Sequence, residues 1–531
     1  MAYTPKHKIR IVTAAALFDG HDAAINIMRR VMQSSGAEVI HLGHDRSVQE
    51  VVDCAIQEDA NAIAITSYQG GHVEYFKYMH DLLQEKGGSH IKLFGGGGGV
   101  ILPSEIDELH AYGITRIYSP DDGRAMGLQG MIDDLIEKAD FPTGQLTDAQ
   151  TQFPDNPTAA TLASYISAVE NFPDSPQTQA LLKSVASKQK AIPVLGITGT
   201  GGAGKSSLVD EIVRRFLLDF ESAPKKIGII SVDPSKRKTG GALLGDRIRM
   251  NAIKNSRVYM RSMATRQSNL AVSKYIQDAL SIYKATDFDL IILETSGIGQ
   301  SDTQITDYCD ASLYVMTPEY GAATQLEKID MLDFADVVVI NKFDKRGAMD
   351  ALRDVKKQYQ RNHKRFDEDI DQMPVFGTIA SQFNDPGTNT LYRSLMEIIC
   401  RKTKADLQSS FMNSDEMSEK VFIIPPARVR YLSEISENNR TYANWVKEQA
   451  ALAQKLFSIQ KTIETLKQET IEDKDRLIKV LEQTYQNLLL SLDPKNKHIL
   501  ENWTLKKRLF QDEYYVFKVR DKELKIKEES P

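Results

Sequence analysis

A glycine-rich stretch in the middle of the chain has the residue types and spacing of a phosphate-binding loop. Residues 199–206 read Gly-Thr-Gly-Gly-Ala-Gly-Lys-Ser, between an apolar run of strand length and a segment of helical composition. Glycines let the backbone approach phosphate oxygens, and the amide groups at a helix N-terminus attract negative charge. We expect Lys205 to reach the terminal phosphates of a nucleotide and the Ser206 hydroxyl to bind Mg²⁺. Further phosphate contacts are expected from Gly201, Gly202, Ala203 and Gly204.

A second motif indicates which base this nucleotide carries. Asn341-Lys342-Phe343-Asp344 directly follows an apolar run of strand length. In GTPases the aspartate of this motif pairs with guanine N1 and the exocyclic amine. The string alone is a weak signal, but its position after a phosphate-binding loop and at a strand end makes it a strong one. We therefore expect GTP or GDP as the bound nucleotide, with the Ala380 backbone contacting the guanine oxygen.

Residues between these two motifs could complete a Mg²⁺ site, because carboxylates at strand ends are where such sites place their acidic residues. The expected Mg²⁺ residues, besides Ser206, are Asp233, Asp246, Glu294 and Thr295. A surface or helix-capping role is the alternative for each acidic residue. We interpret 240–249 as a mobile loop whose Arg249 reaches the phosphates. Gln300 lies two residues later than the glutamine of Ras-like switches, so no catalytic residue is assigned for positioning the attacking water.

Alternating strands and helices must position these residues. The N-terminal part has apolar runs of strand length at 8–15, 38–42, 62–66, 91–94 and 116–118, separated by segments of helical composition. Nearly continuous apolar strands indicate a buried parallel sheet with helices on both faces. The size is typical of a flavodoxin-like α/β domain, whose ligands bind beyond the carboxyl ends of the strands.

The same α/β alternation returns after a segment rich in proline and polar residues. Strand runs at 193–198, 226–232, 288–293, 311–316 and 336–340 predict the parallel sheet of a P-loop GTPase. Beyond this sheet, apolar residues at spacings of four and three over 452–466 predict a helix, and 473–492 a second helix packed against it. The predicted division is a first domain at 1–138, a linker with one or two short helices at 139–188, the GTPase at 189–405 and a helical region at 406–531.

Composition excludes several classes of protein. The chain has 531 residues and a formal net charge of −6, which gives no reason to expect nucleic acid or an anionic membrane as partner. No apolar run approaches the roughly 20 residues that a membrane-spanning helix needs. The three cysteines, at positions 54, 309 and 400, lie far apart. This spacing argues against a disulfide framework and favours a cytoplasmic location.

The motifs of the second α/β region together resemble the G-protein chaperones of cobalamin-dependent acyl-CoA mutases. The resemblance covers roughly residues 190–404. It depends on the stretches at 233–235 (Asp-Pro-Ser), 240–250, 261–266 and 294–301 (Glu-Thr-Ser-Gly-Ile-Gly-Gln-Ser).

The first domain resembles base-off cobalamin-binding domains, through Asp19-Gly20-His21. In that family the histidine replaces the cofactor's own benzimidazole beneath the cobalt. An imidazole nitrogen suits cobalt, and the Asp19 carboxylate would hold the other ring nitrogen. Taken alone, His21 would more often be an ordinary loop histidine. The resemblance also implies cobalamin contacts from Ser67 and from Gly95, Gly96 and Gly97, which leave room for the displaced nucleotide tail. Ala24 and Gln69 depart from the family pattern, which has glycine and leucine there.

The order of the parts resembles that of the fused isobutyryl-CoA mutases, as do the stretches 422–430 and 515–523. This implies the cobalamin-binding and GTPase chaperone part of an adenosylcobalamin-dependent acyl-CoA mutase, which isomerises isobutyryl-CoA and n-butyryl-CoA. GTP hydrolysis would gate loading and protection of the cofactor. No (β/α)₈ pattern of about 250 residues remains. The substrate-binding barrel is therefore expected as a separate subunit or missing C-terminal part, and the chain alone is expected to hydrolyse GTP but to isomerise nothing. A homo-oligomer is also expected.

Two alternatives stay open. One is a stand-alone metallochaperone that delivers cobalamin to another enzyme. The other is a sensor whose GTPase responds to bound cobalamin. Transfer of cofactor to an acceptor would favour the first, and cobalamin-dependent hydrolysis without a mutase partner would favour the second.

Overall fold

Apolar strand runs near the N-terminus pair into a parallel sheet, as the sequence predicts. In the computed structural model this sheet has the order β5-β4-β3-β1-β2-β8. The strands are β1 (Arg10–Ala16), β2 (Glu38–Arg46), β3 (Ala62–Thr66), β4 (Lys92–Gly96), β5 (Arg116–Tyr118) and β8 (Ala242–Leu244). The helices are α1 (Ala23–Ser34), α2 (Val48–Gln57), α3 (His72–Glu85), α4 (Pro103–Tyr112) and α5 (Pro120–Lys138).

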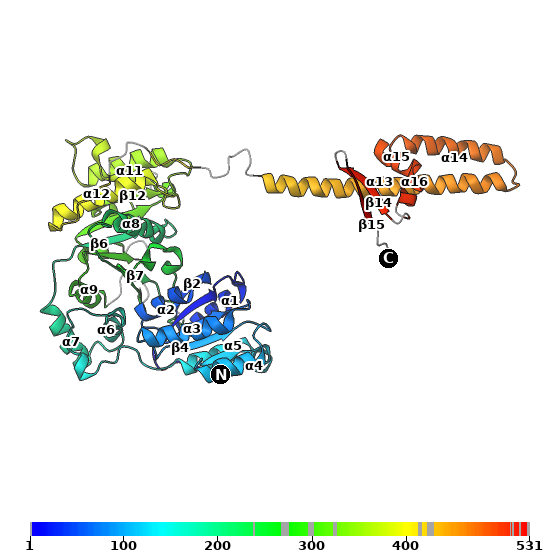
Figure 1. Ribbon diagram of the computed structural model, residues 1–531. Helices are drawn as coiled ribbons and strands as arrows, with labels where there is room; N and C mark the ends of the chain where they lie inside the picture. The colour runs from blue at the N-terminus through cyan, green and yellow to red at the C-terminus, as the bar shows by residue number, and fades with distance from the viewer. Residues whose placement is uncertain are drawn as a thin grey trace. The chain divides into compact units, whose positions relative to one another are not determined.

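Alternating side chains of β1 place helices on both faces of this sheet (Figure 1). Ile11 packs with residues of α1 and α5 on one face. Val12 and Ala14 pack with residues of α2 and α3 on the other. Since successive strand residues point to opposite faces, continuous apolar strands require this double cover.

The structure describes residues 3–236, 239–266, 275–295, 302–321, 326–411, 417–421, 430–509, 511, 514–519 and 522–527. It divides into two units, Met1–Val421 and Phe422–Pro531. Gln300 and the other residues of 296–301 lie outside the described ranges, so the structure does not place them.

A second parallel sheet follows in the first unit, with the order β13-β12-β11-β6-β10-β7-β9. Its strands are β6 (Val194–Gly199), β7 (Ile227–Asp233), β9 (Val258–Ala264), β10 (Leu290–Thr295), β11 (Ala311–Met316), β12 (Val337–Asn341) and β13 (Val375–Thr378). The helices are α8 (Lys205–Asp219), α9 (Ile276–Lys284), α11 (Ala348–Asn362) and α12 (Pro386–Thr403). Short 3-10 helices are η2 (Asp246–Arg249), η3 (Ala252–Lys254), η4 (Asp302–Asp307), η5 (Pro318–Tyr320), η6 (Asp330–Asp333) and η7 (Ile370–Gln372). This confirms the α/β class of both regions.

The segment predicted as a linker contains packed helices. It forms η1 (Asp148–Gln150), α6 (Ala159–Asn171) and α7 (Pro176–Ala186). Ile166 of α6 and Val185 of α7 are fully buried in the same core as strands of the second sheet. The apolar face of α6, rather than the prolines around it, therefore decides how this segment folds.

Part of the stretch predicted as a mobile loop is a strand of the other sheet. β8 pairs parallel with β2, so that Glu38 lies beside Ala242 and Ile40 beside Leu244. Ala242 and Leu244 are fully buried, which explains why the stretch adds to an apolar edge. At Gly241 a Cβ atom would lie only 2.2 Å from the Gln33 carbonyl oxygen, so this close approach requires glycine.

The second unit is mainly helical, as predicted. It contains α13 (Tyr431–Gln468), α14 (Lys474–Leu489), α15 (Pro494–Glu501), α16 (Trp503–Leu509) and an antiparallel pair, β14 (Tyr514–Val519) and β15 (Lys522–Lys527). α14 runs back beside α13 (Figure 1), and an ion pair between Lys467 and Glu482 joins them. Leu456 and Ile463, on the predicted apolar face of α13, are buried.

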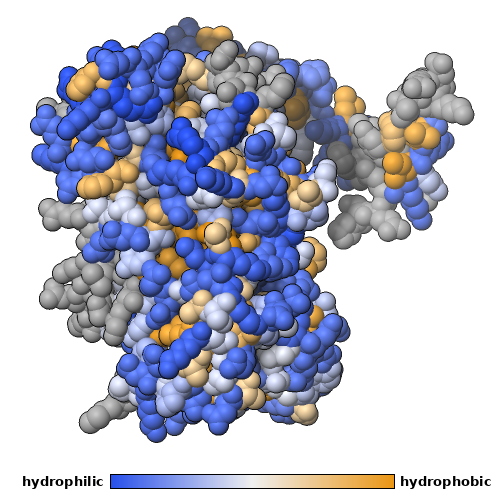
Figure 2. Space-filling view, turned by 90° about the vertical axis from the view of Figure 1, so that its left-hand side faces the viewer, coloured by the Kyte–Doolittle hydropathy of each residue, from blue (hydrophilic) through white to orange (hydrophobic). Residues whose placement is uncertain are grey.

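The visible surface in Figure 2 is mostly polar and charged, with apolar residues in separate small patches. Within the described ranges, none of the helices combines the length and apolar composition that crossing a membrane requires.

Candidate functional sites

The predicted phosphate-binding loop connects β6 to α8, and two of its glycines are required by their surroundings. A Cβ atom at Gly199 would lie 1.9 Å from the Val315 carbonyl oxygen. Gly204, the residue before α8, has φ +88°, and a Cβ atom there would lie 2.6 Å from Asn341 Nδ2. Lys205 Nζ folds back to donate to the Gly199 and Thr200 carbonyl oxygens, at 3.0 and 3.3 Å. A bound phosphate would offer this ammonium a stronger, charged acceptor.

The motif predicted to select guanine is braced against this loop. Asn341 Nδ2 donates to the Ala203 carbonyl oxygen at 2.8 Å, and Lys342 Nζ to the Gly202 carbonyl oxygen at 2.8 Å. The Ala380 amide, predicted to meet the guanine oxygen, donates instead to Asn341 Oδ1 at 3.1 Å. The Asp344 carboxylate lies 3.4 Å from Lys420 Nζ. Three of the four predicted base-side residues thus form one bonded group with the loop.

The predicted Mg²⁺ residues converge on the Ser206 hydroxyl. Its Oγ lies 2.7 Å from Asp246 Oδ1 and 2.9 Å from Glu294 Oε1. A hydroxyl can donate only one hydrogen, so it cannot satisfy two ionised carboxylates at once. Burial raises the pKa of the Glu294 carboxyl well above its usual range, and the Asp246 carboxylate raises it further. Burial and then Asp246 likewise raise the pKa of Asp233.

Buried oxygens at this position have the donor chemistry that Mg²⁺ prefers. Asp233 Oδ2, Glu294 Oε2 and Thr295 Oγ1 are buried and make no hydrogen bond to the part of the chain that the structure describes. A divalent cation would relieve both the carboxylate crowding and these unmet oxygens. Over the described residues, no group of three or more His, Cys, Asp or Glu is placed to hold a metal ion alone. Mg²⁺ would therefore need the Ser206 hydroxyl, nucleotide phosphates and water as further ligands.

Two arginines of η2 differ in their surroundings, since one is exposed near the nucleotide site and the other is buried against the first domain. Arg249, predicted to reach the phosphates, is exposed and close enough to Asp233 to lower the pKa of that carboxyl against the effect of burial. Arg247 is buried and its Nε donates to Glu58 Oε1 in the first domain at 2.7 Å. Sequence reasoning missed Arg247, because an arginine in a loop gives no local signal of a distant partner.

Arg247 belongs to a group of buried charges between the two sheets, called here the junction network. Its members lie on β1, β2, α6, η2 and β9 or directly after α2 and β9, and all but the partly buried Arg266 are buried: Arg10, Glu38, Glu58, Glu170, Arg247, Arg261 and Arg266. Arg10 pairs with Glu38 at 2.9 Å and Arg261 with Glu170 at 2.8 Å. Burial raises the pKa of Glu38, but Arg266 and Arg10 lower it by more and hold it below its usual range. Buried charges without such partners would be strongly destabilising.

The Asp19–His21 pair lies in the loop after β1. Asp19 is buried, and its Oδ1 accepts from the His21 amide at 2.9 Å and lies 2.8 Å from His21 Nδ1. Its Oδ2 accepts from the Tyr68 amide at 2.6 Å. Burial alone raises the pKa of Asp19, but the hydrogen bonds from Tyr68 and His21 lower it by more. The carboxylate therefore stays ionised and fixes the imidazole.

The His21 ring itself is open to ligands. Its side chain is 75% exposed, although Nδ1 is held by Asp19. An Nδ1–H donated to the carboxylate leaves Nε2 as the nitrogen with a free lone pair. This arrangement fits a metal-ligating histidine whose second nitrogen is held by a carboxylate.

A cavity of about 220 Å³ adjoins this loop, between the strand ends and helices α1 and α5. Its walls are mainly apolar or backbone and include Met28, Phe94, Gly96, Tyr118 and Met131. Gly95 and Gly97 are needed for close packing, because Cβ atoms there would lie 2.3 Å from Phe76 Cζ and 2.0 Å from the Ser67 carbonyl oxygen. Ser67 Oγ is buried and bonds no other described residue. The cavity is small and its lining suits a largely apolar group with a few polar atoms.

His72 is a further residue that the motifs did not reveal. It is buried, its Nδ1 lies 3.0 Å from the Gln69 carbonyl oxygen and its Nε2 lies 2.9 Å from Glu105 Oε2. It thus ties the loop after β3 to the first turn of α4, and so supports the loop that holds Asp19.

Comparisons with known proteins agree with this arrangement. The model of the B12 binding domain matches residues 9–119, and that of the methylmalonyl Co-A mutase-associated GTPase MeaB matches 162–421. A fused isobutyryl-CoA mutase of Geobacillus kaustophilus is 54% identical over 98% of this chain and 48% of its own length. Those of Cupriavidus metallidurans and Nocardia farcinica are 50% and 46% identical, over 98% of this chain and 47% and 48% of their own lengths. The chain spans about half the length of these curated relatives.

Proposed function

This chain is a homologue of the cobalamin-binding and GTPase part of the fused isobutyryl-CoA mutases, and we propose that it uses GTP hydrolysis to control a cobalamin held by His21. The observation that carries the proposal is the Asp19–His21 pair, 2.8 Å apart and open on its other side, in the same compact unit as a phosphate-binding loop. Both groups follow the carboxyl ends of parallel strands, where such sheets bind their ligands.

The first site would hold cobalt through His21 Nε2. Asp19 would fix the imidazole, and the apolar cavity beside α1 would take the displaced nucleotide tail, with Ser67 Oγ and the backbone at 95–97 as polar contacts. We propose the adenosyl form of the cofactor, which supplies the radical chemistry when bound. The protein's part is to bind the cofactor and orient its lower ligand.

The second site would hold guanine nucleotide with Mg²⁺. The Gly201–Gly204 backbone and Lys205 would bind the phosphates, and Asn341, Lys342 and Asp344 would select guanine. Ser206, Asp233, Asp246, Glu294 and Thr295 would hold Mg²⁺ directly or through water, and Arg249 would approach the phosphates. The closeness of the Asp246 and Glu294 carboxyl groups at Ser206 supports this assignment, because Mg²⁺ would neutralise their charge.

The complete reaction would be the isomerisation of isobutyryl-CoA and n-butyryl-CoA. Its substrate-binding barrel would be a separate subunit or a further part of a longer protein, and GTP hydrolysis would gate loading and protection of the cofactor. We also propose a homo-oligomeric state and a cytoplasmic location. The three free thiols support that location.

Three assays of the purified chain test the proposal. We expect GTP hydrolysis that requires Mg²⁺, binding of hydroxocobalamin, and no interconversion of the two acyl-CoA substrates. Absence of GTP hydrolysis, or failure to bind cobalamin, would contradict the core of the proposal. Acyl-CoA isomerisation by the chain alone would contradict the separate location of the barrel.

A further inference from the structure

Two neighbouring residues of η2 connect the nucleotide site to the other domain. Asp246 contacts the Ser206 hydroxyl of the phosphate-binding loop at 2.7 Å and the Ser231 hydroxyl at 2.5 Å. The next residue, Arg247, is buried against Glu58 of the cobalamin-binding domain. Because the two residues are adjacent in η2, the bonds that hold the Arg247 side chain also restrain the backbone that places Asp246.

We propose that Glu58 is a positioning residue of the GTPase site, holding Arg247 so that Asp246 stays beside Ser206. The GTPase site would then depend on a residue of the cobalamin-binding domain. This inference rests on the proposed function, in which Asp246 helps to hold Mg²⁺.

The surroundings of Glu58 support a fixed position. The residue follows the last turn of α2 and is fully buried. Its carboxylate accepts from Arg247 Nε at 2.7 Å and from the Ser262 amide at 3.0 and 3.2 Å. Ser262 lies on β9 of the GTPase sheet, and Arg10 of β1 also donates to Glu58 at 3.3 Å. The carboxylate therefore joins η2, the GTPase sheet and the cobalamin-binding sheet at one point.

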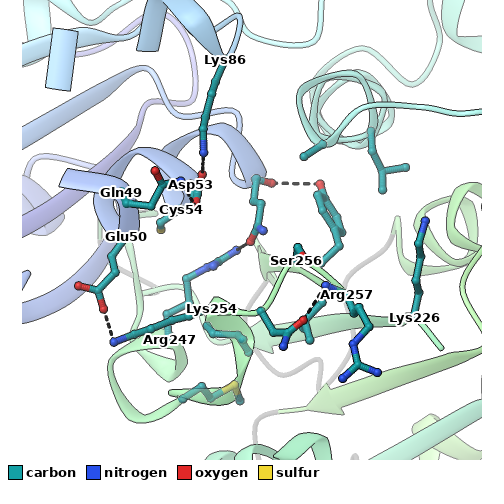
Figure 3. A pocket seen from close by; sticks show the side chains of 18 of the residues that line it. Gln49, Glu50, Asp53, Cys54, Lys86, Lys226, Arg247, Lys254, Ser256 and Arg257 are labelled. Atoms are coloured by element: carbon teal, nitrogen blue, oxygen red, sulfur yellow. Dashed lines mark hydrogen bonds and ion pairs between the residues drawn. The ribbon is translucent and has the colours of Figure 1, made fainter. Parts of the chain in front are cut away.

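The contact between η2 and the C-terminal end of α2 includes directed hydrogen bonds from Arg247 to Glu58 and Gln57. A cavity of about 570 Å³ opens between them, lined by Gln49 and Asp53 of α2 and by Lys254 and Arg257 of the GTPase domain (Figure 3). Arg247 lies on its wall and also donates to Gln57 Oε1 at 3.0 Å. With open space beside it, the arginine is held by directed charged hydrogen bonds, which a neutral isostere would weaken without a change in volume.

The same cavity offers a matched control. Glu50 of α2 pairs with Lys254 of η3 across the opening, but both side chains are partly exposed and neither contacts Asp246. Glu50→Gln therefore removes the same charge from the first turn of the helix that Glu58 follows, and glutamine can still form the capping interaction with Ser47.

The experiment measures GTP hydrolysis by the full chain as a function of Mg²⁺ concentration. In Glu58→Gln and Arg247→Gln we expect the Mg²⁺ concentration for half-maximal hydrolysis to rise about tenfold, as when the orienting partner of a metal site is removed. The affinity for GDP without Mg²⁺ should stay within about twofold, because neither Glu58 nor Arg247 bonds a described residue of the phosphate loop or of the guanine motif. Glu50→Gln should behave like wild type.

Wild-type Mg²⁺ dependence in both variants would overturn the inference while leaving the GTPase assignment intact. Absent hydrolysis in the wild type would instead overturn the proposed function. If Glu58→Gln fails to fold, Arg247→Gln decides alone, since it leaves three arginines opposite three glutamates in the junction network. In the double variant Glu58→Gln/Arg247→Gln, the Mg²⁺ concentration for half-maximal hydrolysis should rise no more than in either single variant. Additive rises would contradict the inference.

Discussion

The nucleotide site and the cobalamin site differ in how far their residues are already fixed. In the nucleotide site, Asn341 and Lys342 bond the phosphate loop and Ser206 bonds two carboxylates. In the cobalamin site, Asp19 is anchored by two backbone amides, while His21 is 75% exposed and bonded through one nitrogen. The residues of the first site bond one another, so a nucleotide would bind there by replacing internal hydrogen bonds. The second holds one carboxylate rigidly and leaves the ligand nitrogen free.

The largest expected effect concerns Lys205 in the nucleotide site. Lys205→Ala should lower GTP hydrolysis by about a hundredfold or more, because it removes a charge placed at the terminal phosphates. Cobalamin affinity should change by no more than about twofold, since none of the described residues bonds to both sites. Steady-state hydrolysis and a cobalamin titration check both. Equal losses in the two assays would show that the sites are not separate.

The next effect tests the anchored carboxylate. In Asp19→Asn the amide oxygen can keep the two contacts with His21, but the amide nitrogen then faces the Tyr68 amide and cannot accept from it. The imidazole loses its charged partner, and the loop that holds it loses an anchor. We expect cobalamin affinity to fall about 10–100-fold, measured by spectroscopic titration. Asp45→Asn is the matched control, because Asp45 accepts the Phe18 amide beside the same loop at 2.8 Å without contacting His21. Similar losses in both variants would remove the special role of Asp19.

A smaller effect concerns the crowded carboxylates. Glu294→Gln should raise the melting temperature of the nucleotide-free, Mg²⁺-free protein by about 2–4 °C. The raised pKa of Glu294 means that ionisation costs stability, a cost that begins above its ordinary pKa of 4.5 and grows as pH rises toward the folded-state value. The gain should therefore be present near neutral pH and vanish in acid. Thermal melts at several pH values check this, and a gain that persists in acid would contradict it.

The smallest effect concerns the cobalamin-binding sheet. Burial, and then Arg29, lower the pKa of His41 to about 4. Arg46 lowers it too, while Asp22 and the contact with Thr13 raise it. The unfolded chain binds the proton near pH 6.5, so His41 favours the folded state above that pH, and this contribution is lost as pH falls toward 4. Between pH 7 and pH 5, the melting temperature of the His41→Asn variant should fall by about 2 °C less than that of the wild type. An unchanged pH dependence would contradict this.

Local patterns were enough to predict much of the fold. The strands at 62–66 and 311–316 have the predicted bounds, because apolar runs are properties of short segments. The motifs of the candidate sites were recognisable for the same reason, since loops at strand ends carry them, and the roles of their residues stay predictions. The structure brings Asn341 and Lys342 to the phosphate loop and Ala380 to Asn341.

What the sequence did not reveal depends on distant pairing. β8 joins β2 although some 200 residues separate them, and Arg247 meets Glu58 across a similar distance. No local periodicity records such partners. The helices within 139–188 were expected, but their burial in the GTPase core was not, because the prolines around them suggested a linker. The four-part domain division stays a prediction.

The most direct test of the account uses the chain labelled with ¹⁵N at histidine and loaded with paramagnetic cob(II)alamin. If His21 ligates the cobalt, the electron paramagnetic resonance spectrum will show the doublet splitting of a ¹⁵N ligand, and His21→Ala will abolish it. A triplet from an unlabelled nitrogen, unchanged by His21→Ala, would show that the cofactor keeps its own base and would contradict the account.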